Sequence, residues 1–195
     1  MGDQAQEVYA FVHHKVLSLS HVQESAFKAT MAQLRRGVGK HPGSTPELWA
    51  ITLDGLPNSF LSTRYGEPTK GEWAIHISLT LFAVHQQGRD RTTKLMNHEG
   101  KTFGRAVQEL AKSPDDLPRI KRRFDATVTS SSIEEVSRHL RGLVQLLKAK
   151  DISLDYPVLA QDLYWFQLAK TRNNVRLKWG QDFYYKGEED NENEK

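Results

Sequence analysis

Apolar side chains recur at intervals of three and four residues along most of this chain, which is the spacing of an α-helix buried on one face. One clear segment spans residues 117–128, with apolar positions at Leu117, Ile120, Phe124 and Val128. A second spans residues 132–148, with apolar positions at Ile133, Val136, Leu140, Leu143, Val144 and Leu147. Arginines occupy the opposite side of both segments. The pattern therefore predicts two helices that bury one face and turn a basic face outward.

Both of these helices have recognisable start signals. Pro118 suits a first helical turn, where its missing N–H has no partner to lose, and Asp115 and Asp116 are placed to cap that turn. Ser132 and Glu135 have the spacing of a capping box, in which each side chain bonds the backbone N–H of the other residue. The serine-rich stretch between the helices is therefore predicted to form a corner.

The same period predicts further helices before and after this pair. They cover residues 4–19, 20–36, 46–52, 72–87, 103–111 and 155–166. In the second of these, Ser20 and Gln23 are placed to cap the helix. The segment 72–87 is apolar on nearly every side, which is typical of a helix buried all round.

Two segments are less regular. Residues 175–185 favour either a last helix or an irregular arm, because Gly180 weakens a helix and two asparagines precede the segment. Residues 88–101 are polar and charged, without helical period, and are expected to form a mobile loop.

No alternating pattern longer than a few residues predicts a strand. We therefore expect an all-α fold, a compact bundle of about eight helices arranged in one body or in two lobes. The helical domain is predicted to span residues 4–185. Residues 186–195 are rich in acids and have nothing apolar to bury, so they are predicted to be a disordered tail.

Charge suggests the kind of partner. The chain carries a formal charge of +3, and its tail holds five acids and two lysines, so residues 1–185 carry +6. A basic body favours a polyanion such as nucleic acid. Cations cluster at three places, with Arg35 and Arg36 in the first, Arg119, Lys121, Arg122 and Arg123 in the second, and Lys170, Arg172, Arg176 and Lys178 in the third.

Each cluster also has a simpler interpretation. Basic runs are often only solvated faces, and Arg35 and Arg36 complement the negative end of their helix. Aromatic residues near the clusters are typical of a core and, less often, of platforms that stack bases. These aromatic residues are Phe124, Trp165, Trp179 and Phe183.

Catalytic machinery is not visible in the sequence. The chain has no cysteine, which excludes disulfides and thiolate sites. Its histidines lack metal-ligand spacing, and no glycine-rich loop is present to hold phosphates. We predict no metal, no cofactor and no enzymatic activity, with a hydrolase using His13, His14 or His85 as a minor alternative. His76 and His85 are predicted to be core histidines.

Location is predicted from what the sequence lacks. No segment has the length and apolar character of a membrane span. The acidic N-terminus is unlike a secretory signal, so the protein is expected to be cytoplasmic.

Several stretches, taken together and in order, resemble a known family. They are LRRGVGKHPGSTPELW at 34–49, TLFAVHQQG at 80–88, FGRAVQEL at 103–110, RRFDATVTSSSIEEVSRHLRGLVQLLK at 122–148, and ISLDYPVLAQDLYWFQ with VRLKWGQDFYY within 152–185. The chain resembles the CasB family, the small subunit of the type I-E CRISPR surveillance complex Cascade. The resemblance implies an all-helical, non-enzymatic subunit in antiviral defence, present as two copies along the inner edge of the complex.

The resemblance also implies partners. They are the other Cas subunits, CRISPR RNA, a second copy of the chain, and target DNA, above all the displaced single strand of the R-loop. The family's basic positions fall on Arg36, Lys70, Arg105, Arg122, Arg123, Arg141, Arg176 and Lys178, and some relatives carry a further basic residue where this chain has Gly142. With the clusters above, the expected nucleic-acid-binding residues are Arg35, Arg36, Lys70, Arg105, Arg119, Arg122, Arg123, Arg141, Arg176 and Lys178. The alternative is a scaffold subunit that braces the complex without touching nucleic acid.

Overall fold

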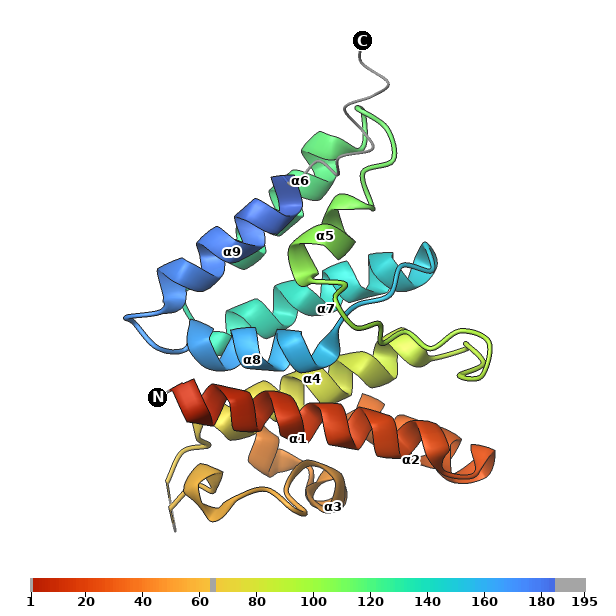
Figure 1. Cartoon of the computed structure of the whole chain (residues 1–195), viewed down its shortest axis with the longest axis vertical. Coiled ribbons are helices and arrows are strands. Elements are labelled where there is room, and N and C mark those ends of the chain that lie inside the picture. Colours follow the sequence, from red (N-terminus) through yellow and green to blue (C-terminus); the bar gives the residue numbers. More distant parts are fainter. Residues whose placement is uncertain (1, 64–65, 185–195) are drawn as a thin grey trace.

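The chain folds into helices joined by turns and longer loops (Figure 1). The structure is a computed structural model and describes residues 2–63 and 66–184, so the predicted tail and Tyr185 lie outside the described residues. The α-helices are α1 (Gly2–His21), α2 (Glu24–Arg36), α3 (Trp49–Thr52), α4 (Lys70–Gln86), α5 (Phe103–Gln108), α6 (Leu117–Val128), α7 (Ile133–Ala149), α8 (Tyr156–Phe166) and α9 (Arg172–Tyr184). Three 3₁₀ turns lie between α2 and α4, at Pro42–Ser44, Pro46–Leu48 and Asn58–Phe60. The all-α prediction is confirmed.

Helix α4 lies at the centre of the fold and packs against α1, α2, α7 and α8. Its start is fixed by a capping box, in which the Thr69 hydroxyl accepts from the Glu72 N–H at 3.1 Å and the Glu72 carboxylate accepts from the Thr69 N–H at 2.7 Å. Nearly every side chain from Ala74 to Ala83 is buried, as the all-round apolar pattern predicts. In the described part of the chain, no helix combines the length and apolar character needed to span a membrane.

Aromatic rings join the four helices above α4. Phe103 of α5 stacks on Phe124 of α6 and meets Trp179 of α9 edge-on, and Phe124 stacks on Phe183 with ring centroids 4.4 Å apart. Trp179 also stacks on Phe166 of α8. The interpretation of Phe124, Trp179 and Phe183 as core residues is confirmed, and the half-buried Trp165 packs against the same core.

The last segment is therefore a helix. Val175, Trp179 and Phe183 are spaced four residues apart and are all buried, so one face of α9 is fixed on the aromatic cluster. Burial outweighs the weak helix propensity of Gly180. The two asparagines before this segment lie in the first turn of α9.

Two predicted caps differ from those observed. Helix α1 continues to His21, and the Ser20 hydroxyl donates to the Leu17 carbonyl at 2.6 Å instead of capping α2. Gln23 occupies the N-cap position of α2 without a side-chain bond. The prediction was wrong because the apolar spacing of α1 continues through Leu19 into this turn, so Ser20 remains inside the helix.

The two central helices also start differently in detail. Asp116 does not cap α6, because its carboxylate accepts from the Ser113 hydroxyl at 3.1 Å and from Arg119 at 3.0 Å. At α7, the Ser132 hydroxyl accepts from the Glu135 N–H at 3.2 Å as predicted. The Glu135 carboxylate bonds the N–H of Ser131 at 2.7 Å, one residue earlier than in a standard capping box.

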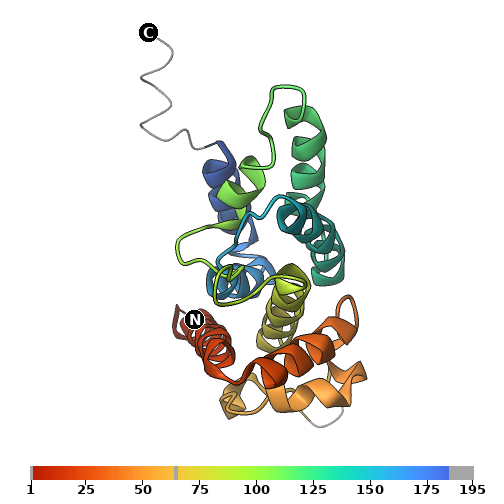
Figure 2. The same ribbon diagram turned by 90° about the vertical axis from the view of Figure 1, so that its right-hand side faces the viewer.

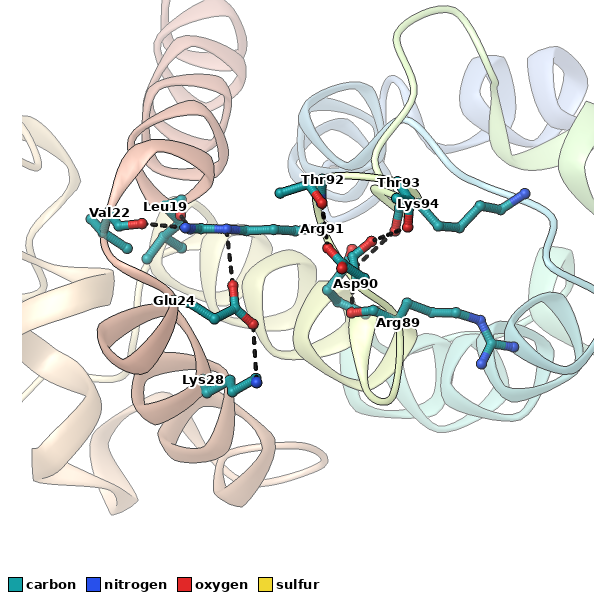
Figure 3. Close-up of polar contacts among 11 residues, drawn as sticks. Leu19, Val22, Glu24, Lys28, Arg89, Asp90, Arg91, Thr92, Thr93 and Lys94 are labelled. Atoms are coloured by element: carbon teal, nitrogen blue, oxygen red, sulfur yellow. Dashed lines mark hydrogen bonds and ion pairs between the residues drawn. The ribbon is translucent and has the colours of Figure 1, made fainter.

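The charged loop after α4 is held at several points. Arg91 reaches across to the corner between α1 and α2, where it donates to the carbonyls of Leu19 and Val22 and pairs with Glu24 at 3.3 Å (Figure 3). Arg89 points the other way and pairs with Asp151 beyond α7 at 2.6 Å. These contacts fasten the loop to both sides of the fold, contrary to the expectation of a mobile loop.

Candidate nucleic-acid interface

Four arginines stand on the outer side of the paired helices α6 and α7. Arg122 and Arg123 belong to α6, and Arg138 and Arg141 belong to α7. All four are exposed, and among the described residues none of them has a hydrogen bond or an ion pair. Their positive charge is therefore available to an external ligand.

Helical periodicity explains this placement. Val136, Leu140 and Val144 are fully buried on the inner side of α7, which fixes the rotation of the helix. Positions 138 and 141 then fall on the opposite side. The same holds for α6, where burial of Ile120 and Phe124 turns positions 122 and 123 outward.

The arginines form a continuous surface across three segments. Nη1 of Arg123 lies 3.8 Å from the position that a Cβ on Gly142 of α7 would occupy. Nη1 of Arg141 lies 3.9 Å from the corresponding position on Gly39, in the turn after α2. The surface thus runs from α6 over α7 to the end of α2, where Arg36 is exposed and also has no partner among the described residues.

We call this surface the arginine ridge and define it as Arg36, Arg122, Arg123, Arg138 and Arg141. In Figure 2, α6, α7 and the end of α2 follow one another along the right-hand side of the molecule. Arg138 was missing from the residues predicted to bind. The signal that identifies it is its spacing of three residues from Arg141 on one face of the helix.

A second positive group lies beside the end of the ridge. The half-buried Arg35 is close to Lys148 and Arg89, and burial, followed by the charges of Arg89 and Arg35, lowers the pKa of Lys148. Lys148 donates to the Gln87 side chain at 3.1 Å. Arg35 therefore sits on the other side of α2 from the ridge but adds to the positive potential at its end.

The remaining expected cations on the surface are more scattered. Arg119 is half-exposed and paired with Asp116 at 3.0 Å, which reduces its availability at the start of α6. Lys70 is exposed at the first residue of α4. Arg105 is exposed on α5, which packs against α9 and lies away from the ridge in Figure 2. The structure does not bring Arg105 together with the ridge.

The last two expected cations, Arg176 and Lys178, contact other residues of the protein. Arg176 donates to the Ser130 carbonyl at 2.9 Å and lies 5.6 Å from the ring centroid of Phe166. Lys178 pairs with the buried carboxylate of Asp162 at 2.8 Å. Burial raises the pKa of Asp162, and the charge of Lys178 opposes that rise. Both cations therefore have structural partners and stand apart from the ridge.

Comparison with known proteins shows which family has this architecture. The sequence model of the family described as CRISPR-associated protein Cse2 matches residues 30–184, which include every residue of the arginine ridge. The chain belongs to the Cse2 family. The crystal structure of CasB from Thermobifida fusca is similar to this Cse2-family chain, with 30% identity, a TM-score of 0.74, and coverage of 92% of this chain and 98% of that one. The resemblance to CasB is thereby confirmed.

A second solved structure supports the fold. The Cse2-family CRISPR-associated protein from Thermus thermophilus is 20% identical, with a TM-score of 0.65 and coverage of 92% of this chain and 97% of that one. None of the curated proteins compared with this chain matches it. The family model begins only within α2, at residue 30.

The buried histidines of this Cse2 protein are part of the core, as predicted. His76 bonds the Gly37 carbonyl at 2.9 Å and so ties α4 to the end of α2. His85 bonds the Tyr156 hydroxyl at 2.8 Å, and burial lowers its pKa to about 4. Across the described ranges, no group of three histidine or acidic side chains could hold a metal ion.

Proposed function

We propose that this chain is a non-enzymatic small subunit of a type I-E CRISPR RNA-guided surveillance complex, Cascade, in antiviral defence. It binds nucleic acid through the arginine ridge and stabilises the R-loop and the displaced non-target DNA strand. The observation that carries this proposal is the ridge itself, five exposed arginines from α2, α6 and α7 without internal partners in the described part of the chain.

The energetics of R-loop formation fit such a surface. Exchange of a DNA duplex for an RNA–DNA duplex is nearly balanced, so modest contacts to a backbone can shift it. Arginines on rigid helices neutralise phosphates without reading sequence. Binding is therefore expected to tolerate many sequences and to weaken as salt is added.

The partners of the proposed subunit follow from the same role. They are other Cas subunits of the complex, CRISPR RNA, the displaced DNA strand and a second copy of this chain. The membership in the Cse2 family supports this set.

The test is a titration of single-stranded DNA at several salt concentrations, with the chain alone and in the assembled complex. If each ridge arginine contacts one phosphate, the log–log slope is expected to be about −3.5, roughly −0.7 for each contact. Arg122→Glu and Arg141→Glu should weaken binding and make the slope less steep. Lys170→Glu, an exposed cation between α8 and α9, is the matched control. A slope that is the same in the parent and in both ridge variants would contradict the proposal.

One observation favours the alternative role as a scaffold subunit. Leu177 and Tyr184 lie on one side of α9 and are each 62% exposed, and Leu117 of α6 is 41% exposed. Exposed apolar side chains of this size are typical of surfaces that contact other proteins. If the scaffold role is the whole function, Leu177→Ser with Tyr184→Ser will abolish assembly while charge reversal on the ridge leaves DNA retention unchanged.

A further inference from the structure

A hollow of about 260 Å³ opens beside the arginine ridge, between α4, α7 and the turn after α2. It is lined by Gly39, Trp73, Glu134, Ser137, Arg138 and Arg141. Two of these residues, Arg138 and Arg141, also belong to the ridge. A phosphate chain lying on the ridge would therefore pass directly over the opening.

Trp73 gives the hollow an aromatic wall. The indole is half-buried and packs against the hydrophobic core, so it is held in place but still reaches the surface. The His41 ring meets it edge-on with centroids 5.4 Å apart, which further fixes its orientation. An indole held in this way is a surface on which a flat ring can stack at little entropic cost.

Among the described residues, the polar side chains that line the hollow have no hydrogen-bonding or ionic partner. Glu134 and Arg138 are one helical turn apart in the order that favours an ion pair, yet no such pair forms between them in the described structure. The hollow therefore offers a carboxylate acceptor and a guanidinium donor, and Ser137 lines the same hollow. A ligand that has both donors and acceptors on one edge matches this arrangement.

We propose that this hollow receives one unpaired nucleobase from a single strand that lies on the arginine ridge. The base stacks on Trp73 and turns its polar edge toward Arg138 and Glu134. The inference rests on the proposed function, because the phosphates on the ridge bring the base to the opening.

The size and position of the hollow favour this occupant. Pockets for whole small-molecule ligands are about 300–1,000 Å³, so a hollow below that range suits a fragment such as one base. Bases of a duplex are paired and stacked with each other, and only an unpaired base is free to enter. The hollow therefore favours single strands over duplexes, a preference that a row of arginines alone does not provide.

The test compares two oligonucleotides of equal length and equal phosphate number, one of deoxyuridine and one in which every position is abasic. The full-length protein is titrated with each at the same salt concentration. We expect the abasic strand to bind about tenfold more weakly, the effect of losing one stacked base. A matched oligouridine, which differs only in its 2′-hydroxyls, identifies whether DNA or RNA supplies the base better.

Variants assign the effect to the indole. Trp73→Leu should weaken binding of the deoxyuridine strand about tenfold and leave binding of the abasic strand unchanged. Trp73→Phe keeps an aromatic face and should restore most of the affinity. Trp165→Leu is the control, since Trp165 is a half-buried tryptophan of α8 that lines a different hollow, beside α9. Melting temperatures show whether each variant is folded, and the comparison of the two strands with the parent protein keeps the test valid if Trp73→Leu is not.

The same measurements distinguish loss of the base site from failure of the proposed function. If Arg122→Glu and Arg141→Glu weaken both strands but the parent binds the two strands equally, the ridge stands and the base site is overturned. If the two charge reversals weaken neither strand, the proposed function fails, and the base site with it. If Trp73 variants lose assembly with other subunits while DNA binding is kept, the hollow receives a protein side chain and the inference is overturned.

Discussion

Arg176 of α9 donates a hydrogen bond of 2.9 Å from Nη2 to the carbonyl oxygen of Ser130. Ser130 is buried at the corner between α6 and α7, the two helices that carry most of the arginine ridge. A second nitrogen of the same guanidinium donates to the Asn173 side chain at 3.2 Å. A basic residue near the C-terminus thus fastens one helix to the corner of two others.

Arg176→Gln and Arg122→Gln are expected to change different properties, the first the stability of the protein and the second its affinity for DNA. Loss of the Ser130 hydrogen bond in Arg176→Gln should lower the free energy of unfolding by about 1.5–3 kcal/mol, with little change in DNA affinity. Arg122→Gln should leave the stability within about 0.5 kcal/mol and weaken DNA binding. Urea unfolding and a DNA titration of both variants decide this. Weaker DNA binding by folded Arg176→Gln, without a loss of stability, would show that Arg176 contacts the ligand directly.

Gly142 offers a substitution that strengthens the ridge. A Cβ at this position in α7 meets only Arg123 Nη1, at the ordinary contact distance of 3.8 Å. Gly142→Ala should therefore stabilise the protein by about 0.5–1 kcal/mol, because alanine restricts the unfolded chain more than glycine does. Gly142→Arg should also make the salt slope of DNA binding steeper by about 0.7. Thermal unfolding and salt titrations measure both effects.

Gly104 is the matched control for this substitution. A Cβ on Gly104 would overlap the Trp179 carbonyl oxygen and lie 2.8 Å from the Phe183 backbone nitrogen. Backbone atoms of α9 cannot yield as a flexible side chain can, so Gly104→Ala should lower the free energy of unfolding by about 3 kcal/mol or more. Equal stability of Gly104→Ala and the parent would contradict the observed packing of α5 on α9.

His85 makes stability depend on pH. Burial lowers its pKa from 6.5 to about 4, so between these values the unfolded chain binds a proton that the folded chain does not. The contribution of neutral His85 to the free energy of unfolding is complete above about pH 6.5. As the pH falls toward 4, up to about 3 kcal/mol of it is lost. His85→Phe removes this titration and keeps the ring contact with Tyr156, whose hydroxyl still has the Leu81 carbonyl as an acceptor.

Unfolding of the parent and of His85→Phe at a series of pH values checks this prediction. The difference in stability between the two proteins should be constant above about pH 6.5 and should shift in favour of the variant on acidification. Parallel pH profiles would show that His85 is protonated equally in the folded and unfolded chains.

Arg91 is expected to control the loop after α4. Its side chain is 10% exposed, and its guanidinium lies 4.8 Å from the Phe27 ring centroid while bonding two carbonyls of the α1–α2 corner. Arg91→Lys keeps the charge but loses the fork geometry, so the free energy of unfolding should fall by about 2–4 kcal/mol. Trypsin cleavage after Lys94 should become faster. Lys28→Gln, which alters only an exposed pair with Glu24, should leave both quantities nearly unchanged.

The helices could be predicted because apolar periodicity is a local property of the sequence. The pattern of Val136, Leu140 and Val144 alone fixes which side of α7 is buried and, with it, where Arg141 points. The caps at Ser20 and Asp116 could not be predicted as reliably. Each of these side chains has two competing partners nearby, and the choice depends on where the preceding helix or turn ends.

The membership of the ridge depended on contacts between distant segments. Arg122 and Arg176 look alike in the sequence, but a carbonyl from another corner of the fold meets only Arg176. Lys178 differs from Arg141 because it pairs with Asp162 of the neighbouring helix α8. The Asp162 carboxylate is buried, and a buried charge is costly without a partner of opposite charge. Trp73 was predicted only as part of the segment 72–87, a helix buried all round. Its exposed edge appears because the turn at Gly39 and the outer face of α7 leave a space beside it.

The three pieces of the ridge are separated in the sequence and meet only in the folded chain. An unfolded chain has the same charges but no fixed spacing between them, so a polyanion matched to the ridge binds the native state more tightly. Added single-stranded DNA should accordingly raise the melting temperature, by an amount that shrinks as salt displaces the strand. The bound strand would thus stabilise the native protein, and the subunit would be hardest to unfold while it holds a strand.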